Sequence, residues 1–389
     1  MKLLIVESPT KAKHIQHFLG SGWQVKASLG HVRDLEKTGD KSYVRPPDFK
    51  MNYQITDDKH KEIVSGLKSA AAKAESVYLA TDPDREGEAI AWHLCQVLNI
   101  KPSDAKRVTY QEVTEQAVKK AIAAPRPMNM KLVAAQEVRR GLDRMVGWEV
   151  SGPLSHSLNT KASAGRVQTP ALRLVVERER AIRAFKPTAY FQIQAHMPGG
   201  WWALWQDGLP DGEYFQDKAF ADALAAALPS MALSVTQAES KPTRKAPPPP
   251  FTTSSLQMDG SRALKCGAED VMKAAQALFE QGAITYHRTD SPNLSEEGEA
   301  LLRAALQSAG LPIVEKPRRW KAKGDAQEAH EAIRPTDPMN ENAGEDDRQR
   351  ALYALIRKRA LASQMPDAIY QQTSCTLDGG VFQGKPAQF

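Results

Sequence analysis

Three acidic residues stand at alternate positions in one short stretch of the chain, namely Asp82, Asp84 and Glu86. Carboxylates this close together repel one another unless a cation neutralises them. Oxygen ligands at this density suit Mg²⁺, which keeps several waters and bridges to phosphate groups. The alternative interpretation is a solvated turn that opens a helix, where the helix dipole favours acidic residues. A fourth acid, Glu7, follows another apolar stretch, and this second position favours the metal-binding interpretation.

The acidic groups follow segments with the composition of buried strands. Apolar runs at 3–6 and 77–80, and a shorter one around Val108, alternate with helical patterns such as the one that places Ile90 and Leu94 on one face. This alternation predicts an α/β unit with a largely parallel sheet. Functional groups of such sheets collect beyond the carboxyl ends of the strands, so we expect the acids to meet at one sheet edge.

A second candidate for chemistry is Tyr286, which has Arg288 two positions further on. A tyrosine hydroxyl has an ordinary pKa of about 10 and is a poor nucleophile when neutral. Attack on a phosphodiester therefore needs nearby positive charge, and a guanidinium matches phosphate geometry. A tyrosine taken alone is more often a half-buried residue of a strand or loop.

Basic residues are concentrated in one part of the chain. The net charge is +6, yet residues 101–200 carry 17 Lys and Arg against 8 Asp and Glu. This local excess predicts a polyanionic partner. Arg139 and Asp143 lie one helical turn apart, and the small residues at 163–165 would let a phosphate approach the backbone near a helix start. The alternative is a solvated, charged helix face.

Several classes of protein are disfavoured by what the sequence lacks. The three cysteines are far apart, without a CxxC pair, so neither a zinc ribbon nor a disulfide framework is expected. No apolar run approaches the roughly 18 residues of a membrane span, and the N-terminus has no signal-peptide core. No GxxxxGK[ST] loop is present, so ATP is not an expected cofactor. These features predict a cytoplasmic protein that does not contact a membrane.

The motifs together resemble a known family. Residues 6–13 and 81–90 are similar to the TOPRIM domain, and in particular to that of type IA DNA topoisomerases of the bacterial topoisomerase I and III kind. Residues 163–168, 282–291 and 327–336 resemble three further motifs of the same family, and all five occur in family order.

The resemblance implies roles for particular residues. The metal ligands, for Mg²⁺ and without zinc, would be Glu7, Asp82, Asp84 and Glu86. The catalytic residues would be Tyr286, Glu7, Lys11, Arg288 and His330. The DNA contacts would be His31, Arg139, Arg140, Asp143, Trp148, Ser163, Ala164, Gly165, Arg166, Val167, Gln168 and Arg288. Two positions depart from the family pattern, since His287 stands where Met is usual and Trp148 where Tyr is frequent.

The implied activity is ATP-independent relaxation of negatively supercoiled DNA. Tyr286 would cleave a single-stranded region through a 5′-phosphotyrosine, the other strand would pass through the gap, and the 3′-hydroxyl would reseal the break. We expect a monomer associated with the nucleoid. Two other classes stay open: a TOPRIM nuclease or primase, and an inactive remnant that only binds single-stranded DNA.

The expected fold class is multi-domain, with an α/β part, helical parts and a strand-rich part that together form a partial type IA toroid. The expected divisions are a TOPRIM domain at 1–128 with an inserted loop at 31–62, an incomplete helical DNA-binding domain at 129–186, the first part of a strand-rich arch at 187–246, a helical domain with the nucleophilic tyrosine at 247–364, and a return into the arch at 365–389. Because the chain stops there, we expect it to be truncated at the C-terminus relative to the family.

Overall fold

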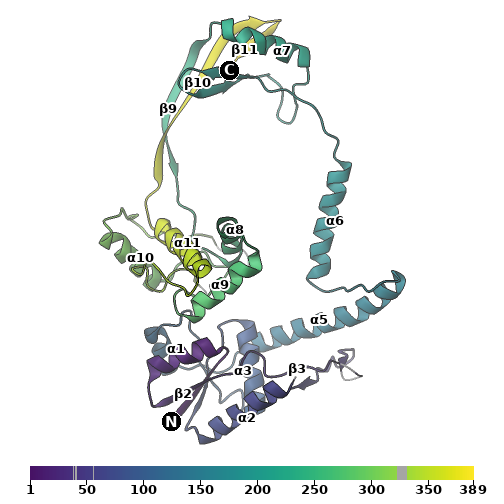
Figure 1. Cartoon of the computed structure of the whole chain (residues 1–389), viewed down its shortest axis with the longest axis vertical. Helices are drawn as coiled ribbons and strands as arrows, with labels where there is room; N and C mark the ends of the chain where they lie inside the picture. The colour runs from purple at the N-terminus through teal and green to yellow at the C-terminus, as the bar shows by residue number, and fades with distance from the viewer. Residues whose placement is uncertain (38, 40–41, 56, 322–330) are drawn as a thin grey trace. The chain divides into compact units, whose positions relative to one another are not determined.

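The computed structural model describes residues 1–389 except 38, 40–41, 56 and 322–330 (Figure 1). Its contacts define two compact units. The first contains Met1–Ala171 and Pro247–Pro366, and the second contains Leu172–Ala246 and Asp367–Phe389. Within the first unit we distinguish a sheet lobe, residues 1–129, and a tyrosine lobe, residues 247–366.

The sheet lobe is built on a four-stranded parallel sheet in the order β2-β1-β5-β6, which confirms the predicted α/β unit. Its strands are β1 (Lys2–Val6), β2 (Trp23–Ala27), β5 (Val77–Leu79) and β6 (Lys106–Arg107). Its helices are α1 (Pro9–Leu19), α2 (Asp58–Lys73), α3 (Arg85–Leu98) and α4 (Glu115–Ala123). A two-stranded ribbon of β3 (Asp34–Leu35) and β4 (Tyr53–Gln54) lies within the segment predicted to be an irregular loop.

The central strand β1 is buried on both faces. Leu4 and Val6 belong to one hydrophobic cluster, which also contains α1 and α4 residues, whereas Leu3 and Ile5 belong to another with α2 and α3 residues. Alternate side chains of a strand point to opposite faces, so helices must cover both sides of the sheet. This burial explains why residues 3–6 form a continuous apolar run.

Two long helices follow the sheet lobe, α5 (Met130–Ser157) and α6 (Gln168–Ala184). Helix α5 continues through Gly147, Gly152 and Pro153. Glycine ends a helix by adopting a positive φ, and Gly147 is not among the residues that do so. A glycine in a helix interior destabilises the helix by only about 1 kcal/mol relative to alanine.

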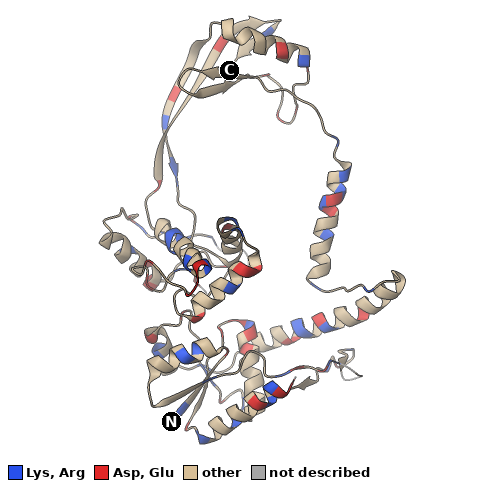
Figure 2. Cartoon of the chain, viewed as in Figure 1, with Lys and Arg blue, Asp and Glu red and all other residues tan. Residues whose placement is uncertain are grey.

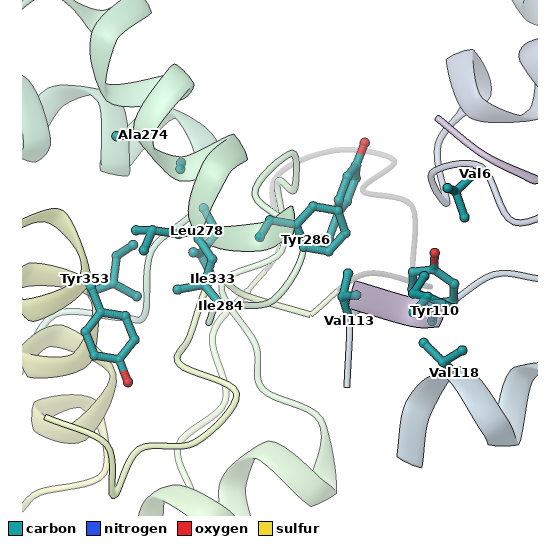
Figure 3. Close-up of a cluster of buried hydrophobic side chains, with 14 of the residues drawn as sticks. Val6, Tyr110, Val113, Val118, Ala274, Leu278, Ile284, Tyr286, Ile333 and Tyr353 are labelled. Atoms are coloured by element: carbon teal, nitrogen blue, oxygen red, sulfur yellow. The ribbon is translucent and has the colours of Figure 1, made fainter. Parts of the chain in front are cut away.

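The tyrosine lobe consists mainly of helices, as the sequence predicted. They are α8 (Thr253–Leu264), α9 (Ala268–Glu280), α10 (Glu296–Ser308) and α11 (Asp347–Ser363). The Ser295 side chain caps α10 by accepting from the Gly298 amide. The apolar face of α9 contributes Val271, Ala275 and Leu278 to a cluster that continues into the sheet lobe (Figure 3).

The second unit is rich in strands, as expected, and it also contains a helix that the sequence interpretation missed. Its strands are β7 (Gln194–Met197), β8 (Trp201–Leu204), β9 (Ser234–Lys245), β10 (Ala368–Phe382) and β11 (Lys385–Gln388). The prediction of strands and turns was wrong at α7 (Lys218–Ala227), an alanine-rich segment capped by Asp217 that buries Phe220 and Leu224. A short 3₁₀ turn, Leu228–Ser230, follows it. Over the residues described, no helix is long and apolar enough to cross a membrane.

Candidate active site and nucleic-acid interface

The two acid-bearing strand ends meet at one edge of the sheet, as predicted. Glu7 follows β1 and accepts a hydrogen bond of 2.9 Å from the backbone amide of Asp82, which lies beyond the end of β5. Lys11 extends from the first turn of α1 and forms an ion pair with Asp82, with both side chains almost completely buried. A buried charge needs such a partner, so Lys11 and Asp82 hold each other in place.

The backbone of the acidic loop has one tightly defined conformation. The Thr81 hydroxyl donates to the carbonyl of Gly87 at 2.6 Å. A Cβ atom at Gly87 would lie 2.2 Å from the Asp82 carbonyl oxygen, so only glycine allows the first turn of α3 to approach this closely. Glycine at this position therefore brings the start of α3 against the end of β5.

Asp84 connects this loop to the tyrosine lobe. One of its oxygens, Oδ1, caps α3 by accepting from the Gly87 amide at 2.7 Å. The other, Oδ2, accepts a 2.7 Å hydrogen bond from the Tyr286 hydroxyl. The structure thus brings the predicted nucleophile into the acidic cluster from a position 202 residues away in the sequence.

The surroundings keep both the tyrosine and the nearest glutamate protonated. Burial raises the pKa of Tyr286 far above its ordinary value, and the charges of Asp82 and Asp84 raise it further. Burial, together with the charge of Asp82, raises the pKa of Glu7 to about 8. At neutral pH the site therefore holds a neutral phenol and a carboxylic acid that can donate a proton.

Two basic residues flank the third acid of the motif. Arg288 Nη1 lies 3.5 Å from Glu86 Oε2 and 3.7 Å from Asp84 Oδ2. His31 Nε2 lies 3.4 Å from Glu86 Oε1, and this hydrogen bond lowers the pKa of Glu86. Arg288 is half exposed, so its guanidinium can turn toward a phosphate that enters beside Tyr286.

A cleft of about 1100 Å³ opens beside these residues. Its basic and acidic lining side chains include His31, Arg33, Asp34, Lys37, Asp84, Glu86, Arg139, Arg140, Asp143 and Arg288. Basic residues recur along α5 in Figure 2, which is the helix that supplies Arg139 and Arg140. Arg140 is paired with Asp34, and the neighbouring Arg139 is exposed. The cleft therefore combines a cationic wall with the acidic cluster.

Arg33 is a cleft residue that the sequence interpretation missed. Its Nη2 lies 3.0 Å from His93 Nδ1, and its guanidinium is 5.4 Å from the ring centroids of Tyr53 and Trp92. Burial, with the charge of Arg33, lowers the pKa of His93 to about 3. The imidazole is therefore neutral and can accept the hydrogen bond that orients Arg33. A lone arginine before an irregular segment gave no signal in the sequence.

The other predicted DNA contacts, Trp148 and residues 163–168, are not among the residues that line this cleft, although Arg166 contacts Asp143, which does line it. Trp148 is edge-on to Tyr43, with ring centroids 4.8 Å apart, and Arg166 Nε donates to Asp143 Oδ1 at 2.8 Å. The segment from Ser163 to Gln168 is tied to α5, because the Ser151 hydroxyl accepts from the Ala164 amide at 2.9 Å. The Gln168 amide donates to the Ser163 hydroxyl at 3.2 Å. His330, the remaining predicted catalytic residue, lies outside the described residues.

A buried arginine behind the acidic loop was also missed. Arg107, at the end of β6, is fully buried and donates to Glu88 Oε2 at 2.9 Å. Its guanidinium also donates to the carbonyls of Thr81 and Asp82 at 2.7 and 2.6 Å. Arg126 binds the same Glu88 carboxylate. Arg107 therefore satisfies carbonyls that the bend after β5 leaves without a strand partner.

The donor set fits a hard divalent cation. Glu7, Asp82 and Asp84 offer only oxygens. Burial and the charge of Asp82 raise the pKa of Glu7, and a cation would favour its charged form. Lys11 and Tyr286 hold two of these carboxylates in this structure. Among the described residues, no three His, Cys, Asp or Glu side chains are already arranged around a metal position.

Comparison with known proteins gives the family. A family profile described as DNA topoisomerase matches residues 127–387, and a Toprim domain profile matches residues 2–113. The chain belongs to the type IA DNA topoisomerases. This confirms the resemblance seen in the motifs and the multi-domain fold class.

Relatives show how much of a topoisomerase the chain represents. It is 47% identical to "DNA topoisomerase I, plasmid" of Xylella fastidiosa over 97% of this chain and 57% of the relative. It is 39% identical to "DNA topoisomerase 1" of Escherichia coli over 98% of this chain and 48% of the relative. The structure of full-length topoisomerase I from Thermotoga maritima superposes with a TM-score of 0.83 at 35% identity, covering 96% of this chain and 63% of that one. The chain thus spans about half the length of the curated relatives it matches.

Proposed function

We propose that this chain performs the DNA cleavage and rejoining of an ATP-independent type IA topoisomerase, acting on a single-stranded region of negatively supercoiled DNA. The observation that supports this most directly is the 2.7 Å hydrogen bond between the Tyr286 hydroxyl and Asp84. This hydrogen bond joins the proposed nucleophile to the acidic cluster, in which Lys11 pairs with Asp82 and which Arg288 borders.

In the cleavage step, the Tyr286 oxygen attacks the phosphorus and the bond from phosphorus to the 3′-oxygen breaks. Asp84 is placed to take the phenol proton, because it already accepts the hydrogen bond of the hydroxyl. While no cation is bound, Glu7, with its pKa raised to about 8, is protonated at neutral pH and can give a proton to the leaving 3′-oxygen. Arg288 and Lys11 stabilise negative charge on the phosphate oxygens. Rejoining is the same sequence in reverse.

Bound Mg²⁺ would supply positive charge and hold the phosphate close to the acids. We assign Glu7, Asp82, Asp84 and Glu86 as the residues that would hold it, and His330 as a further phosphate contact on the basis of the family motif. The cleaved strand would run from the cleft along α5, with His31, Arg139, Arg140, Asp143, Trp148 and Ser163–Gln168 as its contacts. We further propose that the protein acts as a monomer at the nucleoid in the cytoplasm, with the domain divisions given above.

A covalent trapping experiment tests the proposal. The protein is mixed with a 3′-end-labelled single-stranded oligonucleotide and denatured, because a 5′-phosphotyrosine leaves the labelled fragment on the protein. We expect an adduct with the unaltered chain and none with Tyr286→Phe, whereas binding measured by fluorescence anisotropy is retained. Tyr353→Phe is the matched control, since Tyr353 is an equally buried tyrosine of the same lobe.

Other outcomes would identify the alternatives. Cleavage by Tyr286→Phe that releases a free 5′-phosphate would indicate a TOPRIM nuclease. Binding without an adduct in the unaltered chain would indicate an inactive DNA-binding remnant. Either result would contradict the proposed function.

A further inference from the structure

Three consecutive residues that follow β6, Gln111–Val113, contact the segment that carries the nucleophile. We call them the docking strip. The backbone amide of Tyr286 donates to the Gln111 carbonyl at 2.7 Å. Glu112 Oε2 accepts from Arg334 Nη2 at 3.1 Å. The Val113 carbonyl lies against the backbone of Gly282, where a Cβ atom would be 2.4 Å from the carbonyl oxygen.

Arg334 has partners in both lobes. It is almost fully buried and donates to both oxygens of Glu331, at 2.8 and 3.0 Å, within the tyrosine lobe. Glu331 also accepts from the Ser295 hydroxyl at 2.8 Å. If the lobes moved apart, Arg334 would keep these contacts while Glu112 returned to water. The bond from Arg334 to Glu112 can therefore break without leaving a buried charge unpaired.

Arg334 is also joined to the residue that precedes the nucleophile. The Thr285 amide donates to the Arg334 carbonyl at 2.9 Å, and the Arg334 amide donates to the Thr285 hydroxyl at 3.0 Å. Because Thr285 and Tyr286 are adjacent, the contact between Arg334 and Glu112 fixes the position of Tyr286 relative to Asp84.

Apolar contacts surround these polar ones. Figure 3 shows Tyr286 between Val113 and Tyr110 of the sheet lobe and Leu278 and Ile284 of the tyrosine lobe. Apolar packing of this kind holds the two lobes together but does not fix how one lies on the other. Directional hydrogen bonds and the close contact at a glycine do fix that relative position. The contacts of the docking strip therefore determine how the two lobes are positioned at this interface.

We propose that the docking strip, with Arg334 as a positioning residue, sets the register of Tyr286 over Asp84 and is the contact that releases when the two lobes separate. The release rests on the proposed function, because passage of a strand requires the tyrosine, which holds the 5′-end, to leave the acidic edge. The registering role does not depend on it, since all the contacts lie within the free protein.

Hydrogen exchange of the Tyr286 amide tests the registering role without DNA, because the Gln111 carbonyl protects that amide. Two variants disturb the strip by different means: Gly282→Ala inserts a Cβ atom against Val113, and Glu112→Lys places a cation against Arg334. Gly310→Ala is the matched control for the first, because Gly310 has φ +65° against +73° for Gly282 and has open space around it. Glu62→Lys, at an exposed position of α2, controls for the change of charge.

We expect both strip variants to raise the exchange rate of the Tyr286 amide at least tenfold, while the β1 amides and both controls stay within twofold of the unaltered protein. Adduct formation should fall in parallel if the proposed function holds.

Equal exchange in strip variants and controls would overturn the registering role. A rise shared by the β1 amides would also overturn it, since that shows general destabilisation. Altered exchange in a chain that forms no adduct would uphold the register and reject the topoisomerase chemistry.

Discussion

The guanidinium of Arg107 donates to the main-chain oxygen of Asp82 at 2.6 Å, from behind the loop whose side chains face the tyrosine. The same group neutralises Glu88 and binds the Thr81 carbonyl. The acidic edge is thus supported by a cation that has no access to solvent. A buried, multiply bonded arginine of this kind determines geometry through its fork, and not through charge alone.

We expect Arg107→Lys to lower the free energy of unfolding by about 2–4 kcal/mol, because an ammonium cannot satisfy Glu88 and four carbonyls together. Urea unfolding measures this. Arg126→Lys is the control, since Arg126 binds the same Glu88 from a partly exposed position, and it should cost less than half as much. Equal costs would show that only the charge matters.

Gly87→Ala should greatly reduce adduct formation and destabilise the protein by more than 2 kcal/mol, because the new Cβ atom would lie 2.2 Å from the Asp82 carbonyl oxygen. Gly66→Ala in α2 is the matched control. It has open space around it and should stabilise the chain by up to about 1 kcal/mol. A fully active Gly87→Ala protein would contradict the geometry given for the acidic loop.

The raised pKa of Glu7 predicts a pH dependence of stability. Its folded-state pKa of about 8 lies above the ordinary value of 4.5, so the folded state holds a proton that the unfolded state has lost. Its contribution is therefore complete below pH 4.5 and is lost as the pH rises through 8, with a slope of at most about 1.4 kcal/mol per pH unit. Thermal unfolding in EDTA between pH 5 and 8.5 should show a smaller decline for Glu7→Gln than for the unaltered protein. If the stability of both proteins declined equally with pH, Glu7 would not have the raised pKa assigned to it.

Arg139→Ala should weaken binding to a single-stranded oligonucleotide and reduce the slope of log K against log salt by about 0.7, which is the loss of one phosphate contact. Arg139 qualifies because it is exposed and lines the cleft. Lys61→Ala, an exposed cation of α2, should leave the slope unchanged. An unchanged slope for Arg139→Ala would remove this residue from the proposed strand path.

Local patterns in the sequence predicted local structure well. The apolar runs that became β1 and β5, and the acids that follow them, depend on neighbours within a few residues. The segment that forms α7 was misjudged because composition alone does not distinguish an alanine-rich surface helix from a turn. Here tertiary context decides between them.

The long-range part of the site could not be derived from spacing. Only the fold brings Tyr286 to Asp84, and the sequence suggested this pair solely through the resemblance to the family. Arg107 and the docking strip carried no signal in the sequence. Arg107 binds mostly backbone carbonyls, and two of the three strip residues make their contacts through their own backbone carbonyls, whose positions depend on the fold. Buried polar groups of this kind become visible only when every carbonyl has been assigned a donor.

Asp84 divides its two oxygens between the cap of α3 and the tyrosine. The contacts that shape the acidic edge, from Lys11, Gly87 and Arg107, all come from residues of the sheet lobe. Withdrawing Tyr286 would vacate one carboxylate oxygen and leave this scaffold intact. In the proposed reaction, the half of the site that would receive the returning DNA end is therefore assembled in advance, so resealing would require only the return of the tyrosine and no refolding of the acids.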